Sequence, residues 1–264
     1  MIEFTDLHKA FGPKRVLAGF TLTVNDGETL VIIGYSGTGK SVAIKHVVGL
    51  LDPDRGQVAV DGQIVHTLKR DQLSALRSRI GFVFQFSALF DSMTIFDNVA
   101  MGLRRRDLPA GELKDRVAHA LELVDLPGTE AVMPAELSGG MRKRVGLARA
   151  IAIQPKYMLY DEPTTGLDPV TSAVIDGLMI RTREALGVTS IVITHDMRSA
   201  YSVGDRIAML YQGGVRQVGT VEEIRASADP VVRGFIEGRA DGRGAEDAVP
   251  LSAREDLRVE GAAG

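Results

Sequence analysis

The chain contains no cysteine among its 264 residues, which excludes disulfides, thiolate metal sites and cysteine nucleophiles. It also lacks a strong excess of charge of either sign, since 31 basic and 34 acidic residues give a formal net charge of −3. Domains that bind nucleic acid normally carry a marked basic excess. The composition therefore predicts no nucleic-acid partner.

Long hydrophobic runs are missing as well. No apolar stretch approaches the roughly 18 residues that suggest a membrane span, and the first residues lack the basic-then-apolar layout of a signal peptide. The runs that do occur, such as Thr29–Ile33 and Ser190–Ile193, are short and rich in β-branched residues, which is typical of buried strands. We expect any membrane role to come through a partner protein.

The order of elements predicts an α/β fold in four parts. Residues 1–85 are rich in strand patterns, residues 86–152 are helical, and residues 153–225 return to buried strands around a helix. This strand–helix–strand order implies a parallel sheet with right-handed crossovers, interrupted by the helical insert. Residues 226–264 form a C-terminal extension that we expect to be partly flexible, because 241–264 has no aromatic residue and is rich in Gly, Ala and charge.

Apolar periodicity locates the main helices and strands. The predicted helices are Ser41–Leu51, Leu113–Val124, Met141–Ala152 and Val170–Leu186. The predicted strands are Ile2–Leu7, Phe20–Val24, Leu30–Ile33, Gln57–Val60, Tyr157–Tyr160 and Ser190–Thr194.

A glycine-rich loop between a buried strand and a helix matches the pattern G-x-x-x-x-G-K-[ST]. Glycines let the backbone curl around phosphates with its N–H groups inward, and the following helix presents its positive end to the same anion. Lys40 should reach the β- and γ-phosphates, and the Ser41 hydroxyl should ligate Mg²⁺. The predicted phosphate-binding residues are Gly34, Tyr35, Ser36, Gly37, Thr38, Gly39, Lys40 and Ser41.

The apolar strand Tyr157–Tyr160 ends in two acids, Asp161 and Glu162. Carboxylates beside buried neighbours need a cation or a hydrogen-bond partner. Asp161 suits Mg²⁺, through a water, and Glu162 suits the general base or water-orienting group. Two acids at a strand end are also typical of simple solvent exposure, and the phosphate loop makes the catalytic interpretation the better one.

Leu137–Met141 (L-S-G-G-M) resembles the signature of the ABC ATPases, usually written L-S-G-G-Q, and lies before a basic helix. Ser138 can cap that helix while Gly139 and Gly140 expose its N–H groups, which gives a second anion site. The other elements of the family follow in its order. They are Phe11 for stacking on adenine, Gln85 of the Q-loop, Gly166-Leu167-Asp168 of the D-loop and His195 of the H-loop.

The resemblance covers about residues 1–225 and implies a phosphate-loop ATPase core with an N-terminal antiparallel β subdomain and a helical subdomain insert. It implies ATP and Mg²⁺ as cofactors, with Gln85 sensing the metal and the attacking water, and His195 bonding the γ-phosphate. Two subunits of such ATPases pair head to tail. ATP then lies between the phosphate loop of one copy and Ser138, Gly139, Gly140 and Asp168 of the other. Met141 departs from the usual glutamine, so that position receives no predicted ATP contact.

Within the family, the chain looks most like the ATPase of Mla-type (Mce-associated) phospholipid transporters. The signature variant, the Asp161–Thr171 segment and the run Asp229–Gly242 carry this similarity. It implies a peripheral protein on the cytoplasmic face of the inner membrane, two permease subunits, a STAS-domain protein and an Mce-domain lipid-binding protein. It also suggests that Val231–Ala240 reaches the other ATPase subunit, with Val232, Phe235 and Ile236 on one face of a short helix.

Two other functions fit the cassette motifs. One is the ATPase of an importer for a small polar nutrient such as an amino acid, because the permease chooses the substrate. The other is a soluble ABC ATPase that acts on DNA or ribosomes. Those proteins typically carry two cassettes or a long coiled coil, whereas this chain has one compact cassette and no sustained heptads.

Overall fold

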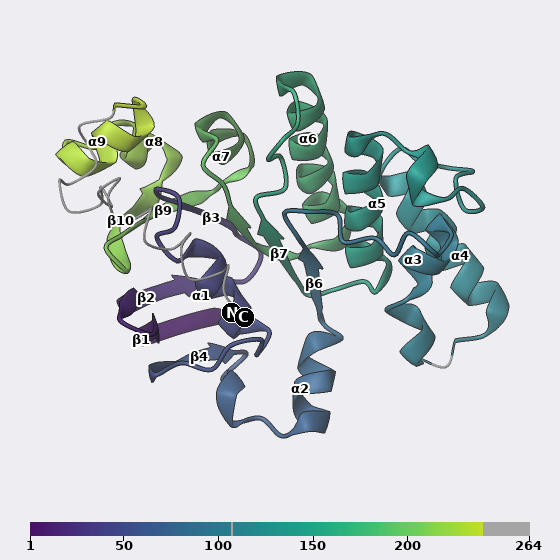
Figure 1. Ribbon diagram of the computed structural model, residues 1–264, viewed down its shortest axis with the longest axis horizontal. Coiled ribbons are helices and arrows are strands. Elements are labelled where there is room, and N and C mark those ends of the chain that lie inside the picture. The colour runs from purple at the N-terminus through teal and green to yellow at the C-terminus, as the bar shows by residue number, and fades with distance from the viewer. Residues whose placement is uncertain (107, 240–264) are drawn as a thin grey trace, which may run out of the picture.

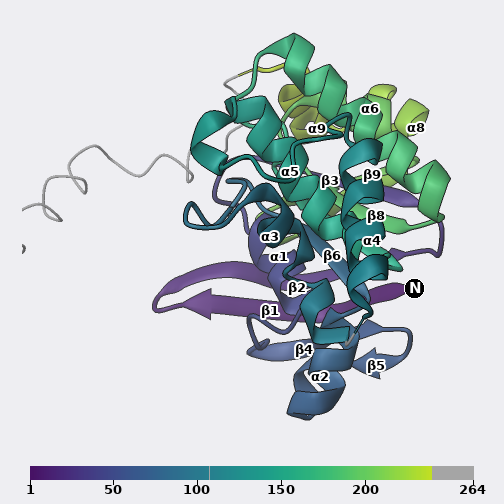
Figure 2. The same ribbon diagram turned by 90° about the vertical axis from the view of Figure 1, so that its right-hand side faces the viewer.

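The computed structural model describes residues 1–106 and 108–239. Its N-terminal part is an antiparallel sheet with the strand order β2-β1-β4-β5. The strands are β1 (Ile2–Phe11), β2 (Lys14–Val24), β4 (Arg55–Val60) and β5 (Gln63–Ile64). Figure 2 shows this sheet below the larger helices of the molecule. The predicted antiparallel β subdomain is thus present.

A second sheet forms the centre of the molecule, with the strand order β10-β9-β3-β8-β7-β6. Its strands are β3 (Thr29–Ile33), β6 (Ile80–Val83), β7 (Tyr157–Asp161), β8 (Thr189–Ile193), β9 (Arg206–Tyr211) and β10 (Gly214–Thr220). Strands β9, β3, β8, β7 and β6 pair in parallel with their neighbours, and β10 pairs antiparallel with β9. The predicted parallel sheet is therefore confirmed for five strands, and the β9–β10 hairpin extends it.

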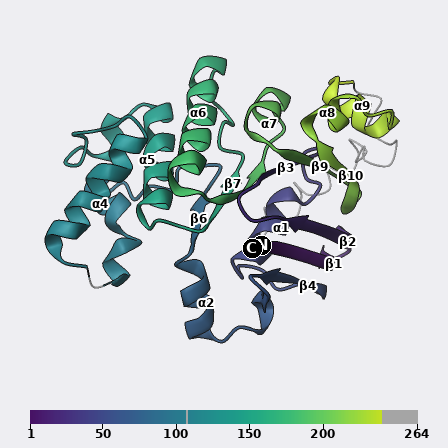
Figure 3. The same ribbon diagram turned by 180° about the vertical axis from the view of Figure 1, so that it is seen from behind.

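The helices are arranged around this sheet (Figure 1). They are α1 (Lys40–Val47), α2 (Arg70–Arg77), α3 (Ile95–Ala100), α4 (Ala110–Leu123), α5 (Gly139–Ala152), α6 (Pro169–Leu186), α7 (Met197–Val203), α8 (Val221–Arg225) and α9 (Pro230–Ile236). Figure 3 shows α4 and α5 at one end of the molecule and α8 and α9 at the other. Among the described residues, no helix combines the length and apolarity that crossing a membrane would require.

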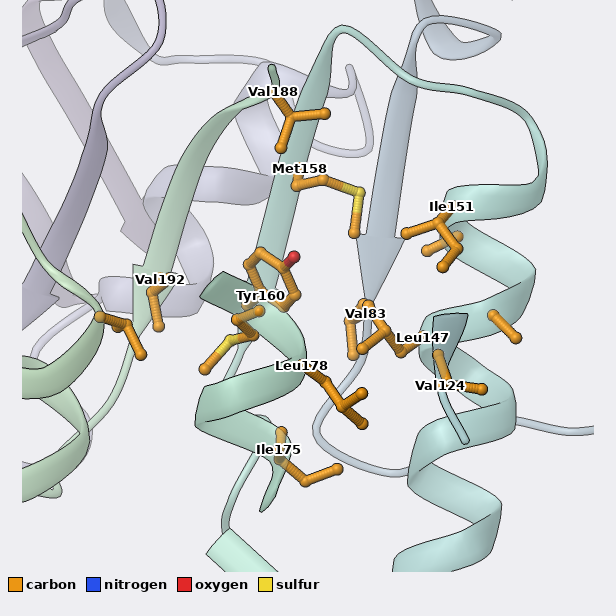
Figure 4. Packing of buried hydrophobic residues seen from close by; sticks show 14 of the residues in the cluster. Val83, Val124, Leu147, Ile151, Met158, Tyr160, Ile175, Leu178, Val188 and Val192 are labelled. Atoms are coloured by element: carbon orange, nitrogen blue, oxygen red, sulfur yellow. The ribbon is translucent and has the colours of Figure 1, made fainter. Parts of the chain in front are cut away.

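Strands β3, β7 and β8 of the central sheet are buried on both faces, and their side chains alternate between two hydrophobic clusters. On β7, Met158 and Tyr160 face the cluster that includes α5 and α6, whereas Tyr157 and Leu159 face the N-terminal sheet and α1. Figure 4 shows the first of these clusters. Each fully buried large side chain stabilises the fold by about 1.5–3 kcal/mol relative to exposure. Burial on both faces explains why these strands read as continuous apolar runs.

The helical insert packs through the stripe that the sequence predicts. Val117, Ala120, Leu121 and Val124 of the α4 region are at most 2% exposed. They join the same cluster as α5 and α6. This packing fixes the start of α5, where the signature segment lies.

The C-terminal helix α9 forms where apolar spacing predicts a helical face. Val232 is fully buried, and Phe235 and Ile236 pack against the core cluster of the same chain. Of the segment expected to reach a second subunit, Val231–Ala240, the part up to Ile236 packs on its own chain, and Glu237, Gly238 and Arg239 are exposed. Ala240 and the rest of the predicted flexible tail lie outside the described residues.

Candidate nucleotide-binding site

The predicted phosphate loop connects β3 to α1 and has the backbone that its glycines allow. Gly34, Gly37 and Gly39 have φ angles of +151°, +80° and +104°, which residues other than glycine rarely adopt. A Cβ on Gly34 would lie 2.4 Å from the Leu210 carbonyl oxygen, and one on Gly39 would lie 2.8 Å from Val16 Cγ1. The loop curvature and its close packing both require glycine here.

Lys40 begins α1 and is only 6% exposed. Its Nζ donates hydrogen bonds to the carbonyl oxygens of Gly34 at 2.8 Å and Tyr35 at 3.0 Å. Burial lowers the pKa of Lys40, and the nearby carboxylates of Glu162 and Asp161 oppose that shift. Within the described part of the chain, no side chain caps α1, and its first N–H groups lie beside the buried ammonium where an anion could accept from them.

The Ser41 hydroxyl lies against Asp161 at the end of β7. Its Oγ donates to Asp161 Oδ1 at 2.6 Å. Burial raises the pKa of Asp161, and the Ser41 hydrogen bond partly offsets this rise. A hydroxyl and a carboxylate are oxygen ligands of the kind that Mg²⁺ takes together with waters and phosphate oxygens. Among residues 1–106 and 108–239, no group of three or more His, Asp or Glu side chains could hold a metal ion.

Glu162 and His195 meet because their strands are neighbours. Asp161 and Ile193 are paired across β7 and β8, which places the ends of both strands at one edge of the sheet. Glu162 Oε2 lies 2.6 Å from His195 Nδ1 and accepts a hydrogen bond from Thr165 Oγ1 at 2.9 Å. Glu162 adopts φ +52°, a conformation that costs a non-glycine residue energy, and its N–H donates to the Ile193 carbonyl at 2.9 Å.

Lys40, Ser41, Glu162 and His195 line one cavity of about 580 Å³, whereas Gly34, Tyr35, Thr38 and Asp161 of the predicted site do not line it. Of the predicted residues, those that line it are Phe11, Ser36, Gly37, Gly39, Lys40, Ser41, Gln85, Glu162 and His195. Phe11 is 48% exposed, so its ring is open for stacking. Lys14, Val16 and Val42 also line the cavity and are not predicted by any motif.

The signature and D-loop residues lie at a different cavity of about 600 Å³. Ser138 caps α5 by accepting a hydrogen bond from the Met141 N–H at 3.2 Å. Asp168 caps α6, and its Oδ1 accepts from the N–H groups of Val170 and Thr171, each at 3.0 Å. Ser138, Gly139, Gly140 and Asp168 line this second cavity together, and none of them lines the first.

One hydrogen-bonded link to the turn after Glu162 was not predicted. Lys143, on the second turn of α5, donates from Nζ to the carbonyl oxygens of Pro163 and Thr165, both at 2.8 Å. Burial lowers its pKa, and the Glu162 carboxylate opposes that shift. Lys143 therefore ties the signature helix to the turn that carries Glu162. In the sequence, only the position of Lys143 in a basic helix directly after the signature could have indicated this role.

The family model for the ABC transporter matches residues 17–165, more than half of the chain. The chain belongs to the ABC transporter ATP-binding family. It is an ATPase cassette, as its motifs predict. Its fold also resembles solved cassettes, among them the dimeric post-hydrolysis state of the ATP-binding cassette MJ0796 bound to ADP and Pi. That similarity has a TM-score of 0.77 at 32% identity, over 84% of this chain and 99% of the other.

Two relatives bear on the transported substrate. The probable ribonucleotide transport ATP-binding protein mkl of Mycobacterium tuberculosis (strain ATCC 25618 / H37Rv) is 41% identical over 242 residues, which is 91% of this chain and 67% of the relative. The intermembrane phospholipid transport system ATP-binding protein MlaF of Escherichia coli (strain K12) is 38% identical over 243 residues. That alignment covers 92% of this chain and 90% of the relative.

Proposed function

We propose that two copies of this cassette pair head to tail, hydrolyse MgATP in sites that both copies complete, and power phospholipid transport through a separate permease. The observation that carries the pairing is the separation of the two half-sites within one chain. Lys40 lies at one cavity, and Ser138 with Asp168 lies at another. The first cavity is lined by Lys40 at the start of α1, and the second by Arg144 and the start of α5, which are groups that attract phosphate. A second copy, turned by a two-fold axis, would join them.

In the proposed site, the phosphate loop and Lys40 hold the triphosphate. The buried ammonium is already aimed at the loop by two carbonyl hydrogen bonds. An anion beside it offsets the cost of burying its charge. Ser41 and Asp161 would hold Mg²⁺, which supplies positive charge to the phosphate oxygens when bound. Phe11, at the mouth of the cavity, would stack on the adenine ring.

Glu162 is the residue that we assign to the attacking water. Its Oε2 is held by Thr165 and His195, which leaves the other carboxylate oxygen to accept a hydrogen bond from water. A carboxylate in this place orients the water and takes its proton as the oxygen attacks. His195 is 60% exposed on the side of the cavity and can contact the terminal phosphoryl group. Gln85 reaches the same cavity from the segment after β6.

The surface beside Gln85 suits a permease contact. Phe84, Phe86 and Phe90 are 38%, 77% and 49% exposed. Exposed aromatic residues gathered on one segment are typical of an interaction site. A permease segment bound here would lie beside Gln85. Such a contact would hold the cassette at the cytoplasmic face of the inner membrane as a peripheral protein.

Phospholipid is the substrate that the relatives favour. The alignment with the E. coli phospholipid transport protein covers 90% of that protein. The alignment with the mycobacterial protein named for ribonucleotide transport covers 67% of that protein. The run Asp229–Gly242, which resembles the Mla-type segment, includes α9. The proposed partners are two permease subunits, a STAS-domain protein and an Mce-domain lipid-binding protein.

The test is to purify the tagged full-length chain from its native membrane in mild detergent. We expect a co-purifying permease and an Mce-domain protein, with bound phospholipid detected by mass spectrometry. ATPase activity of the complex in liposomes should drive phospholipid transfer, and the complex carrying Glu162→Gln should bind ATP without transfer. A soluble binding protein for a small polar solute, or ribosomes, in place of the Mce-domain protein would contradict the proposal.

A further inference from the structure

Tyr35, the second residue of the phosphate loop, packs against the C-terminal helix. Its ring lies 5.1 Å from the Phe235 ring of α9, centroid to centroid, with the planes at 90°. It also lies 6.4 Å from the Tyr211 ring at the end of β9, at 62°. Both are edge-to-face arrangements, which aromatic rings prefer. A residue 200 positions away in the sequence thus supports the loop that we assign to phosphate binding.

The backbone of Tyr35 contacts two polar side chains of the loop, those of Lys40 and Thr38. Its carbonyl oxygen accepts hydrogen bonds from Lys40 Nζ at 3.0 Å and from Thr38 Oγ1 at 2.8 Å. A shift of Tyr35 therefore moves the acceptor that aims the Lys40 ammonium. A Cβ on Gly34 or Gly39 would meet close neighbours, whereas one on Gly37 would meet nothing within 4 Å among the described residues. Tyr35 stands between Gly34 and Gly37, and its ring contacts add support from α9 and β9.

The helix that carries Phe235 is itself firmly placed. Asp229 caps α9 by accepting hydrogen bonds from the N–H groups of Val231 and Val232, at 2.9 and 3.2 Å. Arg216 of β10 donates from Nε to Asp229 Oδ2 at 2.8 Å. Val232 is fully buried in the core. The helix is thus fixed to the central sheet and can serve as a rigid support.

We propose that Phe235 is a positioning residue for nucleotide binding, acting through Tyr35 on the phosphate loop. It does not line the cavity and makes no contact there. Its ring holds Tyr35, and Tyr35 holds Lys40 and Thr38 in the geometry that receives the phosphates. The segment after the cassette then belongs functionally to the nucleotide site of its own chain.

Phe235→Ala in the purified full-length protein tests this proposal. Loss of one edge-to-face pair should raise the dissociation constant of ADP, and the KM for ATP, by about 3- to 10-fold. The kcat should change less than KM, because Glu162 and His195 are not touched. Phe235→Tyr keeps the ring and should restore wild-type affinity. Tyr35→Ala should weaken binding to a similar degree, and the double variant should be no weaker than Tyr35→Ala alone.

Val231→Ala is the matched control, since it removes packing one turn earlier on the same helix without removing a ring. It should leave the ADP affinity at the wild-type value, and melting temperatures show whether each variant is folded. Wild-type affinity in folded Phe235→Ala, or equal losses in Val231→Ala, would overturn the proposal. The proposal rests on the phosphate-loop assignment, which Lys40→Ala tests separately. If Lys40→Ala loses ADP and Phe235→Ala does not, only the role of Phe235 fails.

Discussion

At the scale of single residues, the space around Gly140 is what requires glycine, since its backbone is that of the ordinary helix α5. A Cβ on Gly140 would lie 2.7 Å from Thr171 Cγ2 on α6. Contacts that short force one of the two elements to move. The elements concerned are the start of α5 and the start of α6, which carry Ser138 and Asp168. The two caps at the second cavity therefore depend on the missing side chain.

We expect Gly140→Ala to lower ATPase activity by about 10-fold or more, because misplacing a contact group by about 1 Å is costly for catalysis. The ADP affinity of the isolated chain should not change, since the phosphate loop lies at the other cavity. Steady-state ATPase rates and fluorescent-ADP titration measure the two quantities.

Gly177→Ala on α6 is the control for Gly140→Ala, because a Cβ there meets nothing within 4 Å. It should keep full activity and gain a little helix stability. Full activity in Gly140→Ala would show that the spacing between α5 and α6 does not matter.

Motif residues were predictable from the sequence where a fixed spacing dictates a fixed geometry. Gly34 to Ser41 form one turn between a strand and a helix, and the structure has that turn. Glu162 was predictable from two acids at the end of an apolar strand that accompanies a phosphate loop. His195 required the family resemblance, because only the pairing of β7 with β8 brings it to Glu162. The roles of Lys143 and Phe235 could not be predicted, since both act through contacts between segments distant in the sequence.

At the scale of elements, α6 follows the D-loop and α7 follows His195, and a buried hydrogen bond joins them. Ser199 Oγ on α7 donates to Asp176 Oδ2 on α6 at 2.8 Å. Burial raises the pKa of Asp176 to about 6, with a further rise from Asp196 and an opposing effect of Ser199. Asp176 is 7% exposed, and its Oδ1 has no hydrogen-bond partner among the residues that the structure describes.

Because the pKa of Asp176 is raised on folding, its carboxyl favours the folded state at low pH. This contribution of Asp176 to the free energy of unfolding is complete below about pH 4 and is lost as the pH rises through about 6. Asp176→Asn should therefore stabilise the protein at pH 7.5 by on the order of 2 kcal/mol relative to wild type, and much less near pH 4.5. Urea unfolding of both proteins at the two pH values measures the difference. A difference that does not vary with pH would contradict the assignment.

The sequence predicted the long periodic helices well and the short or terminal elements less well. Val170–Leu186 differs from α6 by one residue, because Asp168 caps it and Pro169 starts it. Ser41–Leu51 extends past α1, which ends at Val47. The β9–β10 hairpin and α2 were not predicted, since β10 is half-exposed and α2 buries only Leu76. Their positions depend on tertiary contacts rather than on local pattern.

At the scale of the whole molecule, the proposed function divides one catalytic site between two cavities of the same chain. The first cavity holds the buried Lys40 ammonium, the Ser41 hydroxyl and the Glu162 carboxylate, and the second lies at the capped starts of α5 and α6. In the proposed pairing, a two-fold axis would combine these halves into two complete sites and make each nucleotide a link between copies. Binding would close the pair and loss of the terminal phosphate would release it, which is how a single phosphate can drive a large movement.

Complementation between two inactive chains tests this shared site most directly. Lys40→Ala removes the first half, and Ser138→Arg blocks the second. In a mixed pair, one of the two sites combines an intact Lys40 with an intact Ser138. We expect each variant alone to be inactive and an equal mixture to recover roughly a quarter of the wild-type ATPase rate. An equal mixture that stays at the sum of the separate rates, or full activity in Ser138→Arg alone, would contradict the account.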